Sequence, residues 1–115
     1  MADDTTDNKR EFARIVRRFV LRVAVDDGNL WPKWSLVTTH NLSAGGALFI
    51  FDQPVKEGQG LHCRLHFVER EVECKARVIR CTHGFQKPLV EVAVAFEWAT
   101  ESDRVFVADF TRNIR

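Results

Sequence analysis

The chain has 115 residues, 45% of them hydrophobic, with 17 Lys and Arg against 16 Asp and Glu and a formal net charge of +1. This length suits one domain with a single core. The near-zero charge argues against general nucleic-acid binding, for which a domain is usually strongly basic. No apolar run approaches the roughly 18–20 residues that cross a bilayer, and the acidic residues 1–7 are unlike a signal peptide. We therefore expect a cytoplasmic protein that neither inserts into a membrane nor binds nucleic acid. Nothing in the composition decides the oligomeric state, for which our expectation is a monomer or a weak dimer.

The positive charge is concentrated near the start of the chain. Residues 1–8 contain no core-forming side chains, and we expect them to be disordered. Residues 9–22 then hold six basic residues against one acidic residue. Arg10 and Arg14 stand four residues apart, and arginine suits bidentate phosphate contacts and stacking on a base. Residues 9–18 are therefore predicted to form a partly ordered basic arm that closes over an anionic ligand, with a merely solvated arm as the alternative.

Alternation of apolar and polar residues predicts six short strands. The clearest examples are residues 61–67 and 71–78, in which every second side chain is apolar. The expected strands cover residues 15–25, 35–40, 47–51, 61–67, 71–78 and 89–98. In the last strand, the apolar run Val92–Phe96 predicts burial on both faces. Many short strands without intervening helices indicate a mainly β, small antiparallel barrel rather than a βαβ architecture.

The period changes from two to about 3.6 in the C-terminal tail, which predicts a helix over residues 100–114. Thr100 followed by Asp103 resembles a capping box. Phe106, Phe110 and Ile114, with Val105 beside them, recur at helical spacing and are predicted to pack on the barrel.

The hexapeptide Asn41-Leu42-Ser43-Ala44-Gly45-Gly46 lies between the second and third predicted strands. Glycine adopts positive φ without steric cost and asparagine tolerates it, so a plain turn explains part of this segment. An asparagine amide, a hydroxyl and bare backbone N–H groups on one bend also suit a planar, hydrogen-bonding, anionic ligand. The hexapeptide alone leaves both interpretations open.

Together, the two segments resemble a known family. An R-x-x-x-R pair ahead of the first strand and a D/N-x-S-x-x-G turn after the second are the signature of PilZ domains, bacterial receptors for the second messenger cyclic di-GMP. Here they read Arg10-Glu11-Phe12-Ala13-Arg14 and Asn41-Leu42-Ser43-Ala44-Gly45-Gly46. The resemblance covers almost the whole chain and implies a six-stranded split barrel over residues 15–98 within a domain spanning residues 9–115.

The resemblance also implies roles for the matching residues. Arg10 and Arg14 would grip phosphate and stack on or hydrogen-bond guanine, Asn41 would read a guanine edge, and Ser43 would bond phosphate or ribose. Gly46, with Gly45, would let the backbone come close to the ligand. Further candidate ligand-binding residues in the basic arm are Lys9, Arg17 and Arg18.

Two details of the arm stay open. Arg14 and Arg18 form a second R-x-x-x-R pair, but we prefer Arg10 and Arg14 because the apolar run Ile15–Val25 begins directly after them. In the family, the residue before the first Arg biases binding toward one ligand or a stacked pair. Here that residue is Lys9.

The resemblance further implies that the arm becomes ordered on binding and signals to an unidentified effector protein in motility, pilus, biofilm or virulence control.

Other constellations are weaker. A zinc site is suggested by His62, Cys63, His66, Cys74, Cys81 and His83. Strand alternation counts against it, because it sends Cys63 and Cys74 to the apolar faces and the histidines the other way, whereas zinc needs converging ligands.

An enzyme is also not expected. Ser43 and His40 could form a nucleophile-and-base pair, but the sequence has no G-x-S-x-G elbow and no evident acidic partner for them, so we expect neither an enzyme nor a cofactor. A PilZ-like adaptor that does not bind the ligand is the main alternative, and a single-stranded nucleic-acid module is a distant one.

The loop after the first predicted strand carries Trp31 and Trp34 around Pro32. A lid or stacking platform is one interpretation of these side chains. We favour the other, in which they cap one end of the core.

Overall fold

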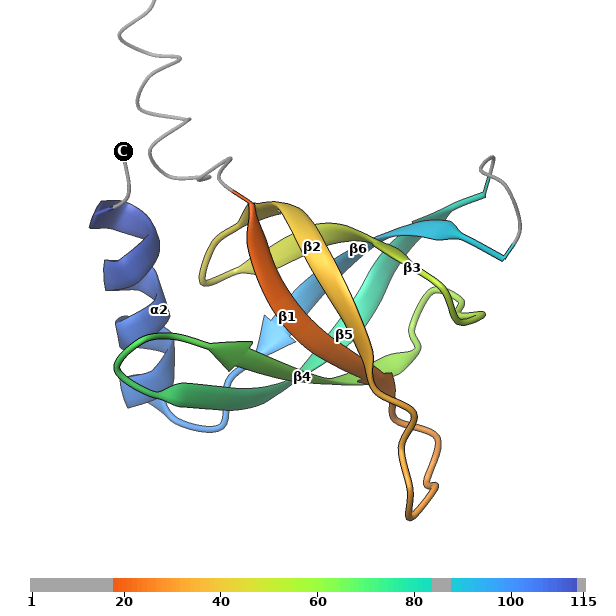
Figure 1. The fold of residues 1–115 in the computed structure, drawn as a ribbon, viewed down its shortest axis with the longest axis horizontal. Helices are drawn as coiled ribbons and strands as arrows, with labels where there is room; N and C mark the ends of the chain where they lie inside the picture. Colours follow the sequence, from red (N-terminus) through yellow and green to blue (C-terminus); the bar gives the residue numbers. More distant parts are fainter. Residues whose placement is uncertain (1–17, 84–87, 114–115) are drawn as a thin grey trace, which may run out of the picture.

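A computed structural model describes residues 18–83 and 88–113 of the chain. Its elements are β1 (Phe19–Val25), β2 (Ser35–Leu42), β3 (Gly46–Phe51), β4 (Gly60–His66), β5 (Glu71–Thr82), β6 (Val90–Glu97) and the helix α2 (Glu101–Asn113). The strands close into an antiparallel barrel in the order β1-β2-β3-β6-β5-β4, and α2 stands beside one end of it (Figure 1). The predicted six-stranded antiparallel barrel with a C-terminal helix is confirmed.

The alternating sequence decides which side chains fill the barrel, because successive residues of a strand point to opposite faces. In β4 the apolar residues Leu61 and Leu65 are fully buried, and in β5 Val72 and Val78 are 2% and 1% exposed. Strand β6 follows the same rule rather than being buried on both faces. Its Val92 is completely buried, whereas its outward alanines are only half-buried. The two-sided burial predicted for β6 is therefore wrong.

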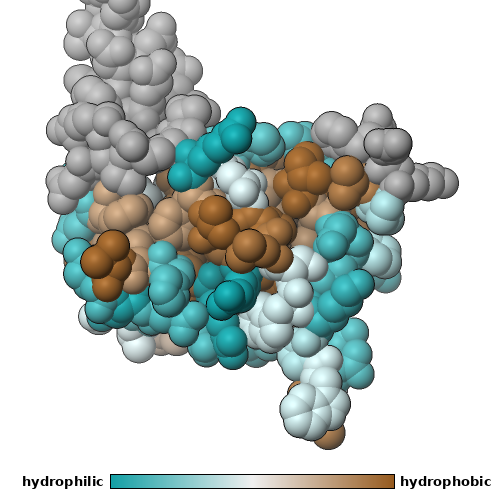
Figure 2. Space-filling model, viewed as in Figure 1, coloured by the Kyte–Doolittle hydropathy of each residue, from teal (hydrophilic) through white to brown (hydrophobic). Residues whose placement is uncertain are grey.

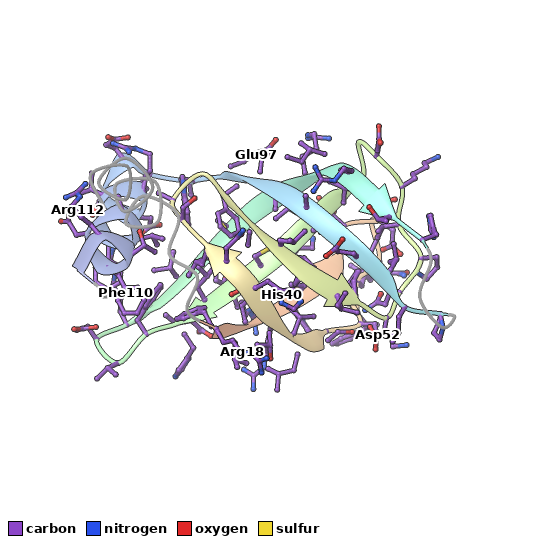
Figure 3. The ribbon with its side chains drawn as sticks, turned by 90° about the horizontal axis from the view of Figure 1, so that it is seen from above. Arg18, His40, Asp52, Glu97, Phe110 and Arg112 are labelled. Carbon is purple, nitrogen blue, oxygen red and sulfur yellow. The ribbon has the colours of Figure 1, made fainter. Side chains whose placement is uncertain are left out.

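The start of β1 and the end of β2 lie at the same end of the barrel. Phe19 pairs with Thr39, so the exposed Arg18 precedes β1 beside the part of β2 that leads into the hexapeptide. In Figure 3, Arg18 and His40 lie closer to the helix than Asp52, which marks the opposite end. Of the predicted arm residues, Lys9, Arg10, Arg14 and Arg17 lie outside the described residues.

The helix begins as its sequence predicts, since the backbone N–H of Asp103 donates to Thr100 Oγ1 at 3.1 Å. The residues that the helix buries differ in part from those predicted. Val107 is fully buried and Phe110 half-buried, whereas Val105 is 40% exposed. Ile114 lies outside the described residues. The helix packs on the β4–β5 turn through Phe67, whose ring lies 5.0 Å from that of Phe106 and 4.7 Å from that of Phe110.

The tryptophan loop does not cap the core as predicted. Trp31 is 88% exposed, and Trp34 lies outside the barrel with the Arg64 guanidinium 4.4 Å above its ring. A polar network lies at the base of this loop instead. Gln53 Nε2 donates to Ser35 Oγ and to the Lys33 carbonyl, both at 2.9 Å. Because these bonds satisfy the polar groups buried there, the core does not need an indole over this end.

Candidate ligand-binding site

The hexapeptide forms a tight connection in which only Ala44 and Gly45 stand between the closing residues. Ser43 N donates to Gly46 O at 3.0 Å, and Gly46 N donates to Ser43 O at 3.3 Å. Asn41 belongs to β2 and Gly46 begins β3. Among the described residues only Gly28 and Gly58 have positive φ. The turn therefore does not use the left-handed freedom of glycine that the plain-turn interpretation invoked.

The space available for a side chain differs between the two glycines of the turn. A Cβ on Gly46 would lie 2.0 Å from the carbonyl oxygen of Val94, because β3 and β6 approach closely where Gly46 pairs with Ala95. A Cβ on Gly45 would meet only Ser43 Oγ, at an ordinary 3.6 Å. Gly46 is thus required by strand packing, while Gly45 faces open space at the surface.

The hydrogen bonds of the turn show what it can offer to a ligand. Ser43 Oγ accepts from the backbone N–H of Gly45 at 3.2 Å. A hydroxyl that accepts one bond keeps its own proton, so Ser43 can donate to a phosphate or ribose oxygen. The N–H groups of Gly45 and Gly46 are both bonded inside the turn. The N–H groups of these two glycines are therefore not available to a ligand, whereas the Ser43 hydroxyl is a donor that the turn can present.

The end of β6 fixes the turn in place. Trp98 Nε1 donates to the carbonyl of Ala44 at 2.7 Å, and Phe96 N donates to the carbonyl of Gly45 at 3.0 Å. The rings of Phe96 and Trp98 lie 5.0 Å apart and pack against the core. Both central residues of the turn are thereby held from outside the hairpin, which keeps Ser43 in a defined position.

Replacing Trp98 with Phe tests this anchor. The variant keeps an aromatic ring but loses the indole N–H, so we expect the free energy of unfolding to fall by about 1–2 kcal/mol. Urea unfolding followed by circular dichroism measures the change. Trp31→Phe is the matched control and should leave the midpoint unchanged, because Trp31 is 88% exposed. Equal midpoints for both variants would show that the Ala44 bond does not stabilise the fold.

A hollow of about 300 Å³ lies on the outer face of the barrel next to the turn. Its lining includes Asn41, Ser43, Gly45 and Gly46 from the hexapeptide, Leu48 from β3, Ile79 and Arg80 from β5, and Ala93 and Ala95 from β6. The small alanine side chains leave room over β6 for a flat group. The structure thus brings together the four candidate residues of the hexapeptide at the edge of one depression.

Sequence reasoning missed the β5 wall of this hollow. The pairing of β5 with β6 shifts register between Val78 and Arg80, which places both Ile79 and Arg80 on the exposed side. Such a shift marks a β-bulge, which inserts an extra residue and re-aims the side chains around it. The signal in the sequence was the break in the regular alternation of β5 at Ile79.

The residues of the zinc alternative do not converge. Cys63 and Cys74 are opposite each other inside the barrel, whereas His62 Nε2 lies on the outside, 3.2 Å from Asp26 Oδ1. A hydrogen bond with Cys74 and burial raise the pKa of the Cys63 thiol, which keeps it in the protonated form that binds metal poorly. Within residues 18–83 and 88–113, no three His, Cys, Asp or Glu side chains are grouped as metal ligands.

The sequence matches the family model of the PilZ domain over residues 8–111. The chain belongs to the PilZ family. PilZ domains are binding and adaptor domains rather than enzymes. The matched range includes both halves of the motif, and the fold and the family are those that the sequence predicted. No curated protein matches the chain.

Solved structures support the fold. The PilZ domain of CeSA from a cellulose-synthesizing bacterium is 22% identical with a TM-score of 0.64, over 85% of this chain and 93% of that one. The inhibitor of motility MotI/DgrA of Bacillus subtilis is 14% identical with a TM-score of 0.68, over 86% and 47%. MrkH of K. pneumonia is 14% identical with a TM-score of 0.64, over 83% and 43%. Our PilZ domain thus spans less than half of the last two proteins, and these likenesses concern the fold alone.

In the described part of the chain, no helix has the length and apolar character to span a membrane.

Proposed function

We propose that this PilZ domain is a cyclic di-GMP receptor in the bacterial cytoplasm. The observation that carries the proposal is the hollow, in which Asn41 and Ser43 lie above a floor of small side chains. The ligand carries phosphates, riboses and flat guanine bases. The Ser43 hydroxyl proton suits a phosphate or ribose oxygen, the Asn41 amide suits a base edge, and the alanines of β6 accommodate a ring.

The position of Arg18 supports a role for the basic arm. Arg18 stands at the end of the barrel from which β2 leads to Asn41 and Ser43. Arg14 lies four residues before it, and four residues span at most about 14 Å. Arg14 can therefore lie up to about 14 Å from Arg18, and Arg10 up to about 28 Å from it. We propose that Arg10 and Arg14 close over the ligand, with Lys9, Arg17 and Arg18 adding positive charge.

Ordering of this arm on binding would be the output of the receptor. A ligand that binds only one state of the arm shifts the population toward that state. An effector protein that recognises the ordered arm then responds to the messenger. The outputs implied by the family resemblance are control of motility, pilus assembly, biofilm or virulence.

Calorimetric titration of the protein with cyclic di-GMP tests the proposal. The double variant Arg10→Ala/Arg14→Ala should bind about a hundredfold more weakly or worse, because each hydrogen bond to a charged group is worth about 1.5–3 kcal/mol. Arg22→Ala removes one exposed arginine of β1 that does not line the hollow, and should bind as the wild type does. The titration also gives the stoichiometry that Lys9 leaves open.

The possible outcomes separate the alternatives. A wild type that binds and a double variant that binds equally well would exclude both arginine pairs, because Arg14 belongs to each of them. The single variant Arg10→Ala separates the two pairs, since only the Arg10 and Arg14 pair predicts that it weakens binding. A wild type that gives neither heat nor a thermal shift at high ligand concentration would refute the receptor function.

One observation favours a second candidate, the adaptor that does not bind the ligand. Apolar side chains gather on the face over β1 and β2 (Figure 2), and the exposed apolar residues of these strands include Val20 and Leu36, at 48% and 68%. Exposed apolar patches commonly mark protein interaction sites. Deleting residues 1–14 distinguishes the two functions, since it should abolish ligand binding and leave adaptor contacts on this face intact.

A further inference from the structure

Arg80 owes its position to the bulge in β5. Val78 pairs with Val94 and is 1% exposed, but the next pairing joins Arg80 to Ala93, so Ile79 is an extra residue. Ile79 is 58% exposed, and Arg80 is exposed beside it. Both side chains line the hollow opposite the hexapeptide. The bulge therefore gives the hollow one apolar and one cationic side chain on its far wall.

Arg80 differs in its contacts from Arg64 and Arg77, the arginines of β4 and β5 that are paired with glutamates. Arg64 Nε lies 2.9 Å from Glu73, and Arg77 Nε lies 3.1 Å from Glu97. Arg80 makes no hydrogen bond or ion pair with any residue that the structure describes. An exposed arginine is usually a solvated side chain, but this one lines a depression and has all its donors available. Its planar fork can therefore bind a ligand with two adjacent acceptors.

The width of the hollow separates Arg80 from Asn41. Asn41 is on β2 and Arg80 on β5, with β3 and β6 between them. Neighbouring strands are about 4.7–4.9 Å apart, so the three spacings amount to roughly 14 Å along the sheet. The two side chains therefore face the hollow from opposite walls, with the alanines of β6 between them.

We propose, on the basis of the proposed receptor function, that Arg80 binds the O6 and N7 atoms of one guanine base and makes the site select guanine over adenine. Guanine presents these two acceptors side by side, and a bidentate arginine matches them. Adenine presents N7 beside the N6 amino group, which would point a donor at a donor. Ile79 and the alanines of β6 supply apolar surface for the face of the same base.

Titrations of the full chain with cyclic di-GMP and with cyclic di-AMP test this proposal. The wild type should prefer cyclic di-GMP, and Arg80→Ala should weaken its binding about five- to hundredfold while changing the affinity for cyclic di-AMP by less than about twofold. Arg80→Lys keeps the charge and can still donate to O6 and N7 but lacks the planar fork, so it should keep only part of the selectivity. Arg80→Gln should shift the preference toward cyclic di-AMP, because glutamine matches the N6 and N7 pattern of adenine.

Arg22→Ala is the matched control, and melting curves show whether every variant is folded. Equal weakening of both ligands by Arg80→Ala would mean that Arg80 supplies only charge, which overturns base reading. No change for either ligand, or a wild type without preference, would overturn it too. A wild type that binds neither ligand would instead refute the receptor function on which the proposal rests.

Discussion

Gly46→Ala should destabilise the barrel by about 3 kcal/mol or more, at the upper end of what overpacking a well-packed site costs. The added methyl carbon would lie 2.0 Å from the Val94 carbonyl oxygen and 3.1 Å from its carbon. These are backbone atoms of β6, which is hydrogen-bonded to β3 on one side and β5 on the other. Because β6 cannot retreat without breaking a ladder, the start of β3 must move instead. This outweighs the gain of about 0.4–1 kcal/mol that glycine-to-alanine changes give at unstrained sites.

Gly45→Ala is the control for this prediction, since it makes the same chemical change one residue earlier, where a Cβ meets only Ser43 Oγ at 3.6 Å. Its stability should equal that of the wild type or slightly exceed it. Urea unfolding followed by circular dichroism compares the two variants. Gly46→Ala should also lose ligand binding, because the displaced strand moves the turn that holds Ser43. A Gly46→Ala protein as stable as Gly45→Ala would contradict the packing argument.

The sequence predicted those parts of the fold that depend on local periodicity. The alternation around Leu61 and Cys63 in β4, and around Val72 and Cys74 in β5, gave the correct inward faces. The hydroxyl of Thr100 capped the helix as expected. These features need only the neighbours of each residue along the chain, which is why they could be found without the structure.

Features that depend on how strands meet could not be found in this way. The close approach at Gly46 comes from a carbonyl on β6, nearly fifty residues further along the sequence. Arg80 lines the hollow because of a register shift. The break in alternation at Ile79 was its trace in the sequence, but a bulge is defined only by its partner strand. Trp31 illustrates the opposite error, since it was expected to cap one end of the core but is 88% exposed, with a polar network around Gln53 at the base of its loop.

Phe67→Ala should lower the free energy of unfolding by about 3–5 kcal/mol, as is usual for a buried phenylalanine. Phe67 is 4% exposed at the β4–β5 turn and lies at the centre of a ring cluster with Phe19, Phe106 and Phe110. Such aromatic pairs add about 0.5–1.5 kcal/mol to the effect of burial. The neighbouring Val68 is fully exposed, so Val68→Ala should leave stability unchanged. Because small domains have only about 5–15 kcal/mol of stability, Phe67→Leu is the milder variant for measurements on the folded protein.

The same cluster links the start of β1 to the helix, which gives the Phe67 variants a second expected effect. Phe19 directly follows Arg18, and its ring lies 5.1 Å from Phe67 and 5.8 Å from Phe110. Weakening the cluster should therefore loosen both the root of the basic arm and α2. We expect Phe67→Leu to speed amide hydrogen exchange in β1 and α2 together, and to weaken cyclic di-GMP binding although Phe67 does not line the hollow. Reduced stability with unchanged affinity would show that the cluster holds the helix without positioning the arm, and Val68→Ala should change neither quantity.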